Sequence, residues 1–241
     1  MIPKVSVISV SVRPEFLDIV KRCLARQTVD YFEWIVVSPF EYKDAIWVED
    51  PPMREGDYYR LNGAWNAGIR KAKGELFVSI VDGLWFPPDT LERLYGHYTS
   101  NQKACVSCIG HQYDKMENGK PENMVWRDPR ARLDQGSYYQ VGPMEMEFCI
   151  ASVPMKALYD VGGFDEEYDK HCALSEKELC NRLDKLGYEF YLDQATEYRA
   201  IKHPRLGGNE KWDAGYGRAC ILFDTHLKQI ESGERQALDY L

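Results

Sequence analysis

The sequence predicts an α/β fold in which a central, mostly parallel β-sheet is flanked by helices. Through the first half of the chain, short apolar runs alternate with amphipathic helical stretches, as they do in βαβ units. The run LFVSIV at 76–81 is apolar at nearly every position, which is typical of a central strand covered on both faces. With 241 residues, the chain is long enough to bury the core of one such domain.

The elements of the first half follow from their patterns. VSVISV at 5–10 predicts the first strand, and FEWIVVS at 32–38 predicts the second. Between them a helix is expected to begin at Pro14, because proline suits a first helical turn. AIWVED at 45–50 predicts an edge strand. The stretch YYRLNGAWNAGIRKAKGE predicts a helix that ends at Gly74, where a C-terminal glycine is favoured.

The second half is less regular. ACVSCIGHQY at 104–113 predicts another strand, and residues 114–143, rich in Asn, Gly, Pro and charge, predict a long excursion without regular structure. The leucine spacing over 175–186 predicts a helix, YEFYL at 188–192 a following strand, and residues 213–232 a closing helix.

Composition narrows the function classes. The net charge of -8 and the isoelectric point near 5.3 argue against nucleic acid as a partner. The seven cysteines are odd in number and lie mostly in apolar or helical stretches, so we expect reduced thiols. Cys105 and Cys108 have no second Cys or His pair at zinc-site spacing. Without a signal peptide or a run of about 20 apolar residues, we expect a cytoplasmic protein with no transmembrane segment.

Asp82 directly follows the predicted central strand. Ligands of open α/β sheets bind outside the carboxyl ends of the strands, so we expect this carboxylate to face a crevice. The alternative is that Asp82 and Gly83 form only a turn, in which the side chain bonds the local backbone.

Four segments occur in a fixed order: VSVISVSVRPEFLDIVKRCLARQTVDYFEWIVV, NAGIRKAKGELFVSIVD, VGGFDEEYD and SEKELCNRL. Together they resemble the family 2 glycosyltransferases of the GT-A fold, and the resemblance extends to about residue 205. In that family the second segment reads N-x-G-x-x-x-A-x-G-E before a strand and a D-x-D, the third reads G-G-F-D-E, and the fourth places an acidic pair ahead of a helix. The resemblance implies a Rossmann-like nucleotide-diphospho-sugar transferase fold.

The resemblance also implies how the chain is organised. We expect a single GT-A catalytic domain over 1–241. Residues 1–110 form its nucleotide-sugar-binding half and residues 111–205 its acceptor and catalytic half. Residues 206–241 add a C-terminal loop and helix.

By resemblance, Asp82 lies beside the sugar nucleotide and its divalent metal. Mn2+ or Mg2+ held by hard oxygen ligands would neutralise the charge of a departing diphosphate. The second acid of the D-x-D is replaced by Leu84, which cannot bind a metal. Either metal binding is lost, or His203 completes the site with Asp82; a surface histidine is the alternative for His203.

The base-binding position also departs from the family. An acidic pair commonly follows the second strand, whereas this chain has Pro39 there. Glu41 or Asp44 could substitute, backbone groups could read the base, or the donor is not UDP-linked. Other residues are expected near the donor, past the first strand and on the following helix: Ser11, Arg13 and Asn66.

Glu176 is the candidate general base. By resemblance it is the second acid of the family's pair, and the dipole at a helix start favours its ionised form. Transfer with inversion needs one carboxylate within hydrogen-bond reach of the acceptor hydroxyl. The alternative is a first-turn Glu that serves only the helix dipole. Ser175 and Glu178 have the spacing of a capping box.

Several residues are assigned to the acceptor side. Asp165 and Glu166 lie in the family's acceptor region, next to two glycines that indicate an unusual backbone. Glu147 and Trp126 could line an acceptor groove, because aromatic faces stack on sugar rings, although Trp126 could equally belong to the core.

The leading interpretation is an inverting glycosyltransferase of the hexosyltransferase type (EC 2.4). It would move a sugar from a UDP- or GDP-linked donor to a saccharide or other hydroxyl acceptor, with Glu176 as base and Asp82 on the donor side. One alternative is a GT-A protein that binds nucleotide sugars without turnover, which Leu84 and Pro39 favour. A sugar-1-phosphate nucleotidyltransferase is disfavoured, because no glycine-rich loop follows the first strand.

Overall fold

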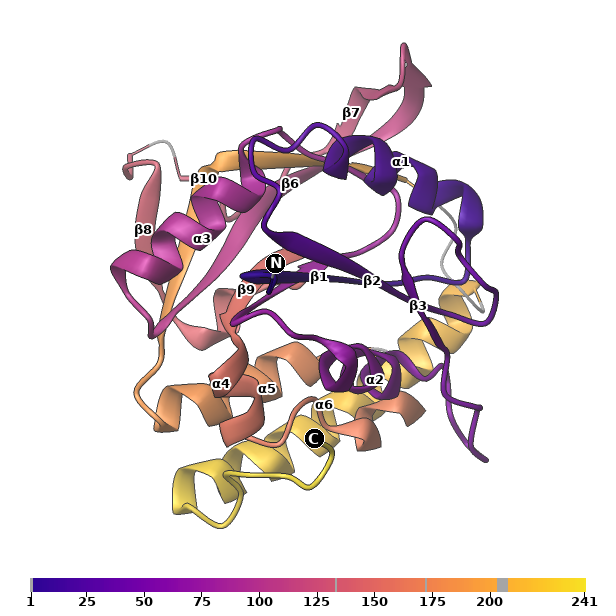
Figure 1. The fold of residues 1–241 in the computed structure, drawn as a ribbon. Helices are drawn as coiled ribbons and strands as arrows, with labels where there is room; N and C mark the ends of the chain where they lie inside the picture. The colour runs from indigo at the N-terminus through magenta and orange to yellow at the C-terminus, as the bar shows by residue number, and fades with distance from the viewer. Residues whose placement is uncertain (1, 133, 172, 203–207) are drawn as a thin grey trace.

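The computed structural model contains one ten-stranded sheet with helices on both faces (Figure 1). It describes residues 2–132, 134–171, 173–202 and 208–241. The strands are β1 (Val5–Val10), β2 (Phe32–Ser38), β3 (Ile46–Glu49), β4 (Leu76–Ile80), β5 (Leu84–Trp85), β6 (Ala104–Glu117), β7 (Lys120–Trp126), β8 (Tyr138–Val141), β9 (Ile150–Pro154) and β10 (Glu189–Ile201). The helices are α1 (Pro14–Leu24), α2 (Leu61–Lys71), α3 (Thr90–Ser100), α4 (Met155–Asp160), α5 (Ser175–Lys185) and α6 (Gly208–Ser232), with short 3-10 helices η1 (Pro143–Glu145) and η2 (Glu166–Lys170).

The sheet order is β3-β2-β1-β4-β9-β6-β10-β5, with β7 beside β6 and β8 beside β10. The first four strands pair in parallel, and β6 pairs in parallel with β10. Along this path only β9 and β5 run against the others. The prediction of an α/β fold with a mostly parallel sheet is confirmed.

Two apolar cores lie on the two faces of the sheet. One contains the buried faces of α1 and α3, and the other contains those of α2, α4 and α5 (Figure 1). All five residues of β4 are buried, as expected for a strand covered on both sides. Because β1, β3 and β4 are parallel, their carboxyl ends lie at the same edge of the sheet. Residues that follow these ends can together form a binding site.

The predicted boundaries of β1 and β2 are confirmed residue for residue. The predicted end of α2 at Gly74 is wrong. The helix ends at Lys71, and Ala72 turns to extended backbone with ψ of 147°, so Gly74 lies beyond the helix. The helix end is satisfied by the Ala72 backbone N–H, which donates to the carbonyls of Gly68 and Ile69.

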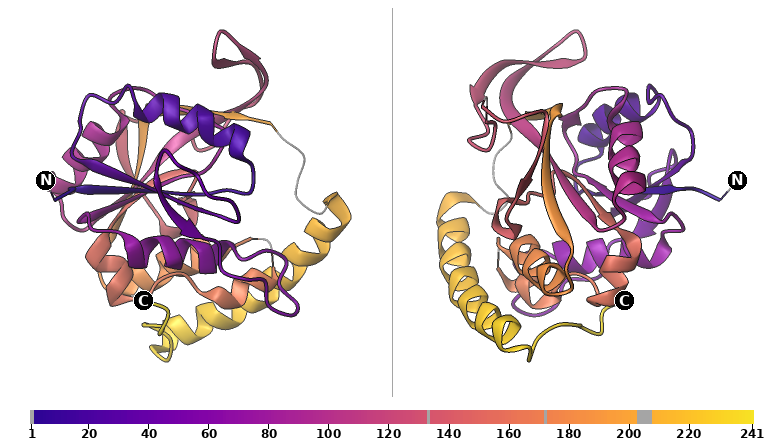
Figure 2. Two further views of the ribbon diagram at one scale, coloured as in Figure 1. Left: turned by 45° about the vertical axis from the view of Figure 1, so that its right-hand side comes forward. Right: turned by 90° about the vertical axis from the view of Figure 1, so that its left-hand side faces the viewer.

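The expectation of an irregular excursion over 114–143 is also wrong. Strand β6 continues to Glu117 and turns back as β7, and β8 pairs with β10. Asn118 and Gly119 both have positive φ at the turn, which is the backbone that a tight hairpin requires. Figure 2 shows this hairpin projecting beyond the rest of the sheet.

The C-terminal segment packs against the second core layer. Helix α6 contacts α5, and the chain after it returns to Gly162, where a Cβ atom would lie 1.5 Å from the Leu238 carbonyl oxygen. Gly162 and Gly163 both have positive φ, so the unusual backbone predicted from the two glycines is present. In the described part of the chain, no helix combines the length and the apolar character that crossing a bilayer requires.

Candidate active site

Asp82 lies at the carboxyl edge of the sheet but is more enclosed than expected. Its side chain is only 5% exposed, because Arg13 covers it. Oδ1 accepts a hydrogen bond from Arg13 Nη2 at 2.7 Å, and Oδ2 accepts from Arg13 Nε at 3.1 Å and from Ser11 Oγ at 2.5 Å. The predicted proximity of Ser11, Arg13 and Asp82 is therefore present, and Asp82 faces a crevice as expected, but its carboxylate is buried rather than exposed.

These three residues line a cavity that we call the strand-end pocket, with a volume of about 200 Å³. Its walls come from the ends of β1, β3 and β4 and from the start of α2. The lining residues are Val10, Ser11, Val12, Arg13, Asp50, Tyr59, Arg60, Leu61, Val81 and Asp82. Sites for whole small molecules usually enclose about 300–1,000 Å³, so this pocket fits part of a nucleotide rather than all of it.

The described residues around Asp82 do not form a metal-ligand set. Both oxygens of Asp82 already accept hydrogen bonds, and Leu84 lies in β5 with its side chain in the apolar core. A divalent cation would have to displace the Arg13 guanidinium, which already neutralises the carboxylate. The predicted ligand His203 lies outside the described residues.

Among the described residues, one other group has metal-like spacing. Ligand atoms of Asp165, Glu167 and His226 all lie within 4.8 Å of one another. Asp165 is already paired with Arg235, and it also accepts a hydrogen bond from Tyr240. The imidazole lies between the two acids, with Nδ1 3.4 Å from Asp165 and Nε2 3.5 Å from Glu167.

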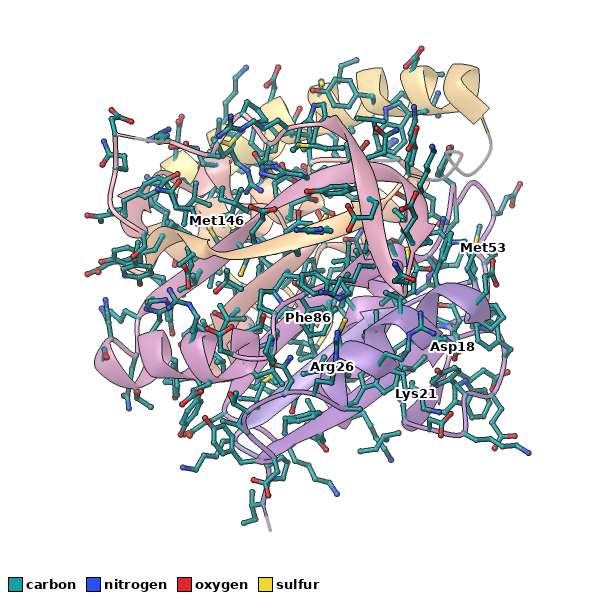
Figure 3. The ribbon with its side chains drawn as sticks, turned by 90° about the horizontal axis from the view of Figure 1, so that it is seen from above. Asp18, Lys21, Arg26, Met53, Phe86 and Met146 are labelled. Carbon is teal, nitrogen blue, oxygen red and sulfur yellow. The ribbon has the colours of Figure 1, made fainter. Side chains whose placement is uncertain are left out.

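The loop after β2 folds onto α1 rather than over the strand-end pocket. Asp44 pairs with Lys21 at 2.7 Å, and the Tyr42 hydroxyl donates to Asp18 at 2.9 Å. Lys21 and Asp18 both belong to α1 (Figure 3). Glu41 is exposed and, like Asp44, is not among the residues that line the pocket. The acid that does reach the pocket is Asp50, which sequence reasoning did not single out.

Asn66 does not line the strand-end pocket itself, but it contacts a residue that supports the pocket wall. It is fully buried, and its Nδ2 donates to the Phe164 carbonyl at 2.8 Å and to Glu166 Oε1 at 3.2 Å. Glu166 in turn accepts from Arg60 Nη2 at 2.7 Å. Asn66 thus positions Glu166, which holds Arg60 in the pocket wall. Glu166 was assigned to the acceptor side, and these contacts place it beside the donor-side wall instead.

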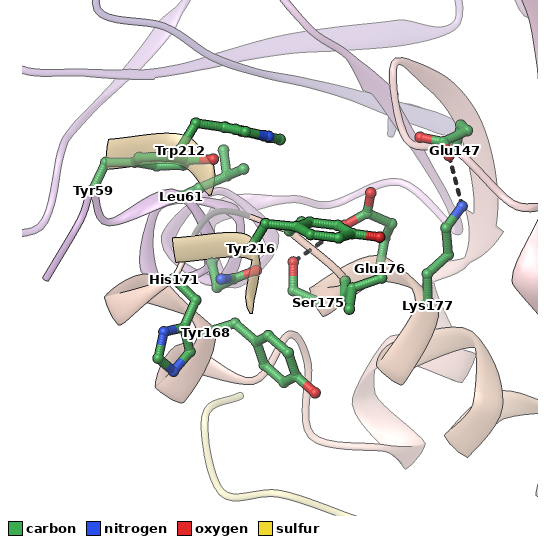
Figure 4. Close-up of a pocket in the computed structure, with 13 residues that line it drawn as sticks. Tyr59, Leu61, Glu147, Tyr168, His171, Ser175, Glu176, Lys177, Trp212 and Tyr216 are labelled. Carbon is green, nitrogen blue, oxygen red and sulfur yellow. Dashed lines mark hydrogen bonds and ion pairs between the residues drawn. The ribbon is translucent and has the colours of Figure 1, made fainter. Parts of the chain in front are cut away.

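Glu176 lines a second cavity, which we call the Glu176 pocket, of about 420 Å³ (Figure 4). Aromatic rings from three parts of the chain line it, namely Tyr59 before α2, Tyr168 in η2, and Trp212 and Tyr216 in α6. The Lys177 ammonium pairs with Glu147 at 2.7 Å, as the dashed line in Figure 4 shows. The pocket therefore combines flat apolar faces with two carboxylates and one ammonium group.

The pKa of Glu176 is raised above its usual range. Burial of the carboxyl is the main cause, and the negative charge of Glu147 adds to it, while Lys177 acts in the opposite direction. Ser175 Oγ donates to Glu176 at 3.3 Å, a long hydrogen bond. A carboxylate with a raised pKa is a stronger base than an ordinary one, which suits it to accept a proton.

The capping box predicted for Ser175 and Glu178 is wrong. The helix cap is Leu174, in the left-handed region with φ of 72°, and its side chain makes no cap hydrogen bond. Glu178 instead forms a fully buried ion pair with Arg182, at 2.9 Å, and also pairs with Arg235. Arg182 is therefore a structural partner of this acid.

The two pockets are neighbours, because Tyr59 and Leu61 line both. A third cavity of about 380 Å³ adjoins the Glu176 pocket through Glu147 and includes Trp126, whose side chain is exposed rather than in the core. Glu147 and Trp126, both assigned to an acceptor groove, are thus in one cavity. Asp165 is only 1% exposed and serves the internal contacts described above.

Comparison with known proteins agrees with this architecture. Residues 54–156 match the family model described as glycosyl transferase family 2. The resemblance to family 2 is confirmed. A search of the curated proteins finds no sequence match.

Solved structures of other glycosyltransferases share the GT-A fold of this chain. The crystal structure of S. aureus TarS 1-349 in complex with UDP has a TM-score of 0.57 and 16% identity, covering 83% of this chain and 61% of that one. GalNAc-T7 with UDP, GalNAc and Mn2+ has a TM-score of 0.65 and 14% identity, covering 84% of this chain and 44% of that one. The chain thus spans less than two thirds of either protein structure.

Proposed function

We propose that the chain transfers a sugar, with inversion, from a nucleotide-diphosphate donor to a hydroxyl acceptor. The observation that carries this proposal is the adjacency of the strand-end pocket and the Glu176 pocket, which share Tyr59 and Leu61. All lining residues of the first pocket belong to 1–110, the half assigned to the donor. The UDP in the TarS and GalNAc-T7 structures supports a nucleotide-sugar donor, of which a hexose is the expected sugar.

On the donor side, Arg13 would bind the leaving diphosphate, and Ser11, whose hydroxyl donates to Asp82, would help to hold Asp82 and Arg13 in place. As the bond from the sugar carbon to the diphosphate oxygen breaks, negative charge grows on that oxygen. A guanidinium fixed by Asp82 is already oriented to stabilise it without rearrangement. Asp82 then acts by positioning Arg13, a role that differs from direct metal binding.

On the acceptor side, Glu176 would take the proton of the attacking hydroxyl. The hydroxyl oxygen bonds to the sugar carbon on the face opposite the diphosphate, and its proton passes to the Glu176 carboxylate. The rings of Trp212 and Tyr216 offer faces on which an acceptor sugar can stack. A saccharide is therefore the acceptor class that the lining favours.

A divalent metal has general support from the Mn2+ in the GalNAc-T7 structure and from the cluster of Asp165, Glu167 and His226. Mn2+ or Mg2+ remains our expectation for such a metal. At Asp82, however, the described side chains favour a guanidinium over a metal ion. Arg13 is therefore the cation that we assign beside the diphosphate.

Replacement of Arg13 by Met tests this assignment. We expect a loss of UDP affinity of roughly 10- to 100-fold, because hydrogen bonds to charged groups are worth about 1.5–3 kcal/mol. In the unmodified protein, EDTA should leave UDP affinity nearly unchanged; isothermal titration measures both effects. Arg22→Met, at an exposed position of α1, the helix that begins directly after Arg13, is the control. If EDTA abolishes UDP binding and Arg13→Met binds UDP normally, the diphosphate is bound by a metal ion and not by Arg13.

Glu147→Gln tests the electrostatics of the proposed base. Removing the Glu147 charge takes away a contribution that raises the pKa of Glu176, and it frees Lys177 to interact with Glu176. Both changes lower that pKa, so the ionised base should persist to lower pH. The acidic limb of the kcat/KM profile should move to lower pH. If the acidic limb is unchanged or moves to higher pH, Glu176 is not the group whose ionisation sets that limb.

The alternative of a nucleotide-sugar-binding protein without turnover is favoured by one observation, the apolar Leu84 in β5. A panel of UDP- and GDP-sugars, with and without Mn2+, distinguishes the two functions. A transferase should release free nucleotide slowly by hydrolysis and should be stabilised by the nucleotide in a thermal shift. Thermal stabilisation without any release, in the presence of candidate saccharide acceptors, would support the binding protein.

A further inference from the structure

The third cavity extends the Glu176 pocket away from the strand-end pocket. It shares Glu147 with the Glu176 pocket, and no described residue lines both the third cavity and the strand-end pocket. Figure 4 shows Glu147 on the opposite side of the Glu176 pocket from Tyr59, which the strand-end pocket shares. The volume of the third cavity, about 380 Å³, lies within the range of about 300–1,000 Å³ that is usual for small-molecule sites. A ligand bound beside Glu176 can therefore continue past Glu147 into the third cavity.

Trp126 gives the third cavity a flat apolar face. It is the last residue of β7, it lines the cavity, and it is 46% exposed. Its neighbours Met124 and Val125 are exposed as well, so this end of β7 contributes no buried face to the core. An indole ring in the wall of a cavity offers a surface on which a sugar ring can stack. The exposure of Trp126 thus fits contact with a ligand better than support of the fold.

His111 supplies a hydrogen-bond donor in the cavity wall. It is only 7% exposed, and its Nδ1 accepts the backbone N–H of Asp128 at 3.0 Å. A nitrogen that accepts a hydrogen bond carries no hydrogen, so the neutral ring carries its hydrogen on Nε2. Glu197 Oε2 lies 3.8 Å from Nε2, which is beyond hydrogen-bond distance. Among the described residues this N–H has no hydrogen-bond partner, so it is available to a hydroxyl oxygen of a ligand.

The charged groups of the third cavity are already paired, which favours a neutral ligand. Arg130 pairs with Asp128 at 2.6 Å, and its guanidinium also donates to Ser107 Oγ and to two backbone carbonyls. Lys177 pairs with Oε1 of Glu147 at 2.7 Å, which leaves Oε2 as an acceptor without a partner in the described part of the chain. Because the described wall has no unpaired cation, the cavity does not suit a phosphate or a carboxylate. An indole face, an imidazole N–H and a carboxylate oxygen together suit a neutral ligand rich in hydroxyl groups.

We propose that the third cavity binds the second sugar unit of the acceptor, so that the acceptor is a saccharide of at least two units. Its terminal unit would lie in the Glu176 pocket, and the next unit would stack on Trp126. Hydroxyl groups of that second unit would accept from His111 Nε2 and donate to Glu147 Oε2. This inference rests on the proposed function, because the terminal unit must lie beside Glu176. A monosaccharide would fill the Glu176 pocket alone and would forgo these contacts.

The test compares the binding of a disaccharide with the binding of its terminal unit. The full chain, with UDP present, is applied to a glycan array that carries mono-, di- and oligosaccharides. Isothermal titration then measures the affinity for the disaccharide with the strongest signal and for the methyl glycoside of its non-reducing unit. We expect the disaccharide to bind roughly 10-fold more tightly, the size expected from one added stacking contact and one added hydrogen bond.

Replacement of Trp126 by Ala should lower the ratio of these two affinities roughly 3- to 10-fold, because the stacking contact is lost. The affinities for the methyl glycoside and for UDP should stay unchanged, which a general loss of structure would not allow. Trp126→Phe keeps a flat ring and should retain most of the ratio. Val125→Ala is the matched control, since Val125 is an exposed residue of the same strand that does not line the cavity.

Equal affinities for the disaccharide and its terminal unit, or an unchanged ratio in Trp126→Ala, would overturn the second sugar site. The transferase proposal would stand in that case if the methyl glycoside still accepts sugar from a UDP- or GDP-sugar. Absence of binding to every saccharide on the array would also overturn the inference. Hydrolysis of UDP- and GDP-sugars by the same preparation then shows separately whether the donor half of the proposed function stands.

Discussion

Glu176→Gln is expected to lower sugar transfer by roughly 10²- to 10⁴-fold, the usual contribution of general base catalysis. The amide fills nearly the same space as the carboxyl but cannot accept the hydroxyl proton. Nucleotide affinity should stay unchanged, because Glu176 lines the acceptor-side pocket and not the strand-end pocket. Transfer is measured as kcat from nucleotide release with a saccharide acceptor, and binding is measured by titration with UDP.

A control on the same helix is Asp184→Asn, an exposed acid near the end of α5. It should retain full transfer. Normal turnover by Glu176→Gln would remove Glu176 as the base, and Glu147, the other carboxylate of the pocket, would be the next candidate.

Arg182→Met is expected to lower the free energy of unfolding by about 3–5 kcal/mol, because it leaves a buried carboxylate without its main partner. Arg182 is fully buried, and its guanidinium donates to Glu178 and to the carbonyls of Val161 and Gly163. All three acceptors lose a hydrogen bond in the variant, and only Arg235 remains beside Glu178. Urea denaturation followed by circular dichroism measures the change.

Lys156→Met is the matched control. Lys156 and Asp160 also form an ion pair at a spacing of four residues, but the lysine side chain is 79% exposed. Water screens such a pair, so the cost should be about 0.5 kcal/mol or less. Equal losses in the two variants would show that burial does not set the strength of the Glu178–Arg182 pair.

The parallel half of the fold was predictable from local pattern. Strands β1, β2 and β4 are predominantly apolar because both faces of the sheet are covered, and this makes their boundaries visible in the sequence. The hairpin of β6 and β7 was missed because β7 is exposed at nearly every position, so no buried face marks it. Asn118-Gly119 was the local signal that could have identified it.

The candidate site was predictable where it follows the ends of strands. Ser11, Arg13 and Asp82 come directly after β1 and β4, and parallel strands bring their carboxyl ends together. Glu41 and Asp44 were candidates for the base-binding position after β2, but tertiary contacts such as that of Lys21 with Asp44 hold that loop against α1. Asp50 had a comparable signal, since it ends the edge strand predicted at 45–50.

The aromatic wall of the Glu176 pocket was not predictable in the same way. Trp212 and Tyr216 lie on α6, and the position of a C-terminal helix depends on packing contacts that no local pattern records. The ion pair of Glu178 with Arg235 is one of these contacts, because it joins α5 to the chain beyond α6. The resemblance to family motifs ended near residue 205, so it gave no reason to place α6 at the site.

The attachment of α6 limits how the gene can be trimmed for expression. A fragment stopped at residue 205 would strip Trp212 and Tyr216 from the cavity and leave Glu178 with one arginine fewer. Even the last residues are anchored, since the Tyr240 carbonyl accepts from Arg70 and the Leu238 N–H donates to Val161. Expressed versions of the protein should therefore keep all residues through Leu241. A purification tag placed at the C-terminus should be separated from Leu241 by a flexible spacer.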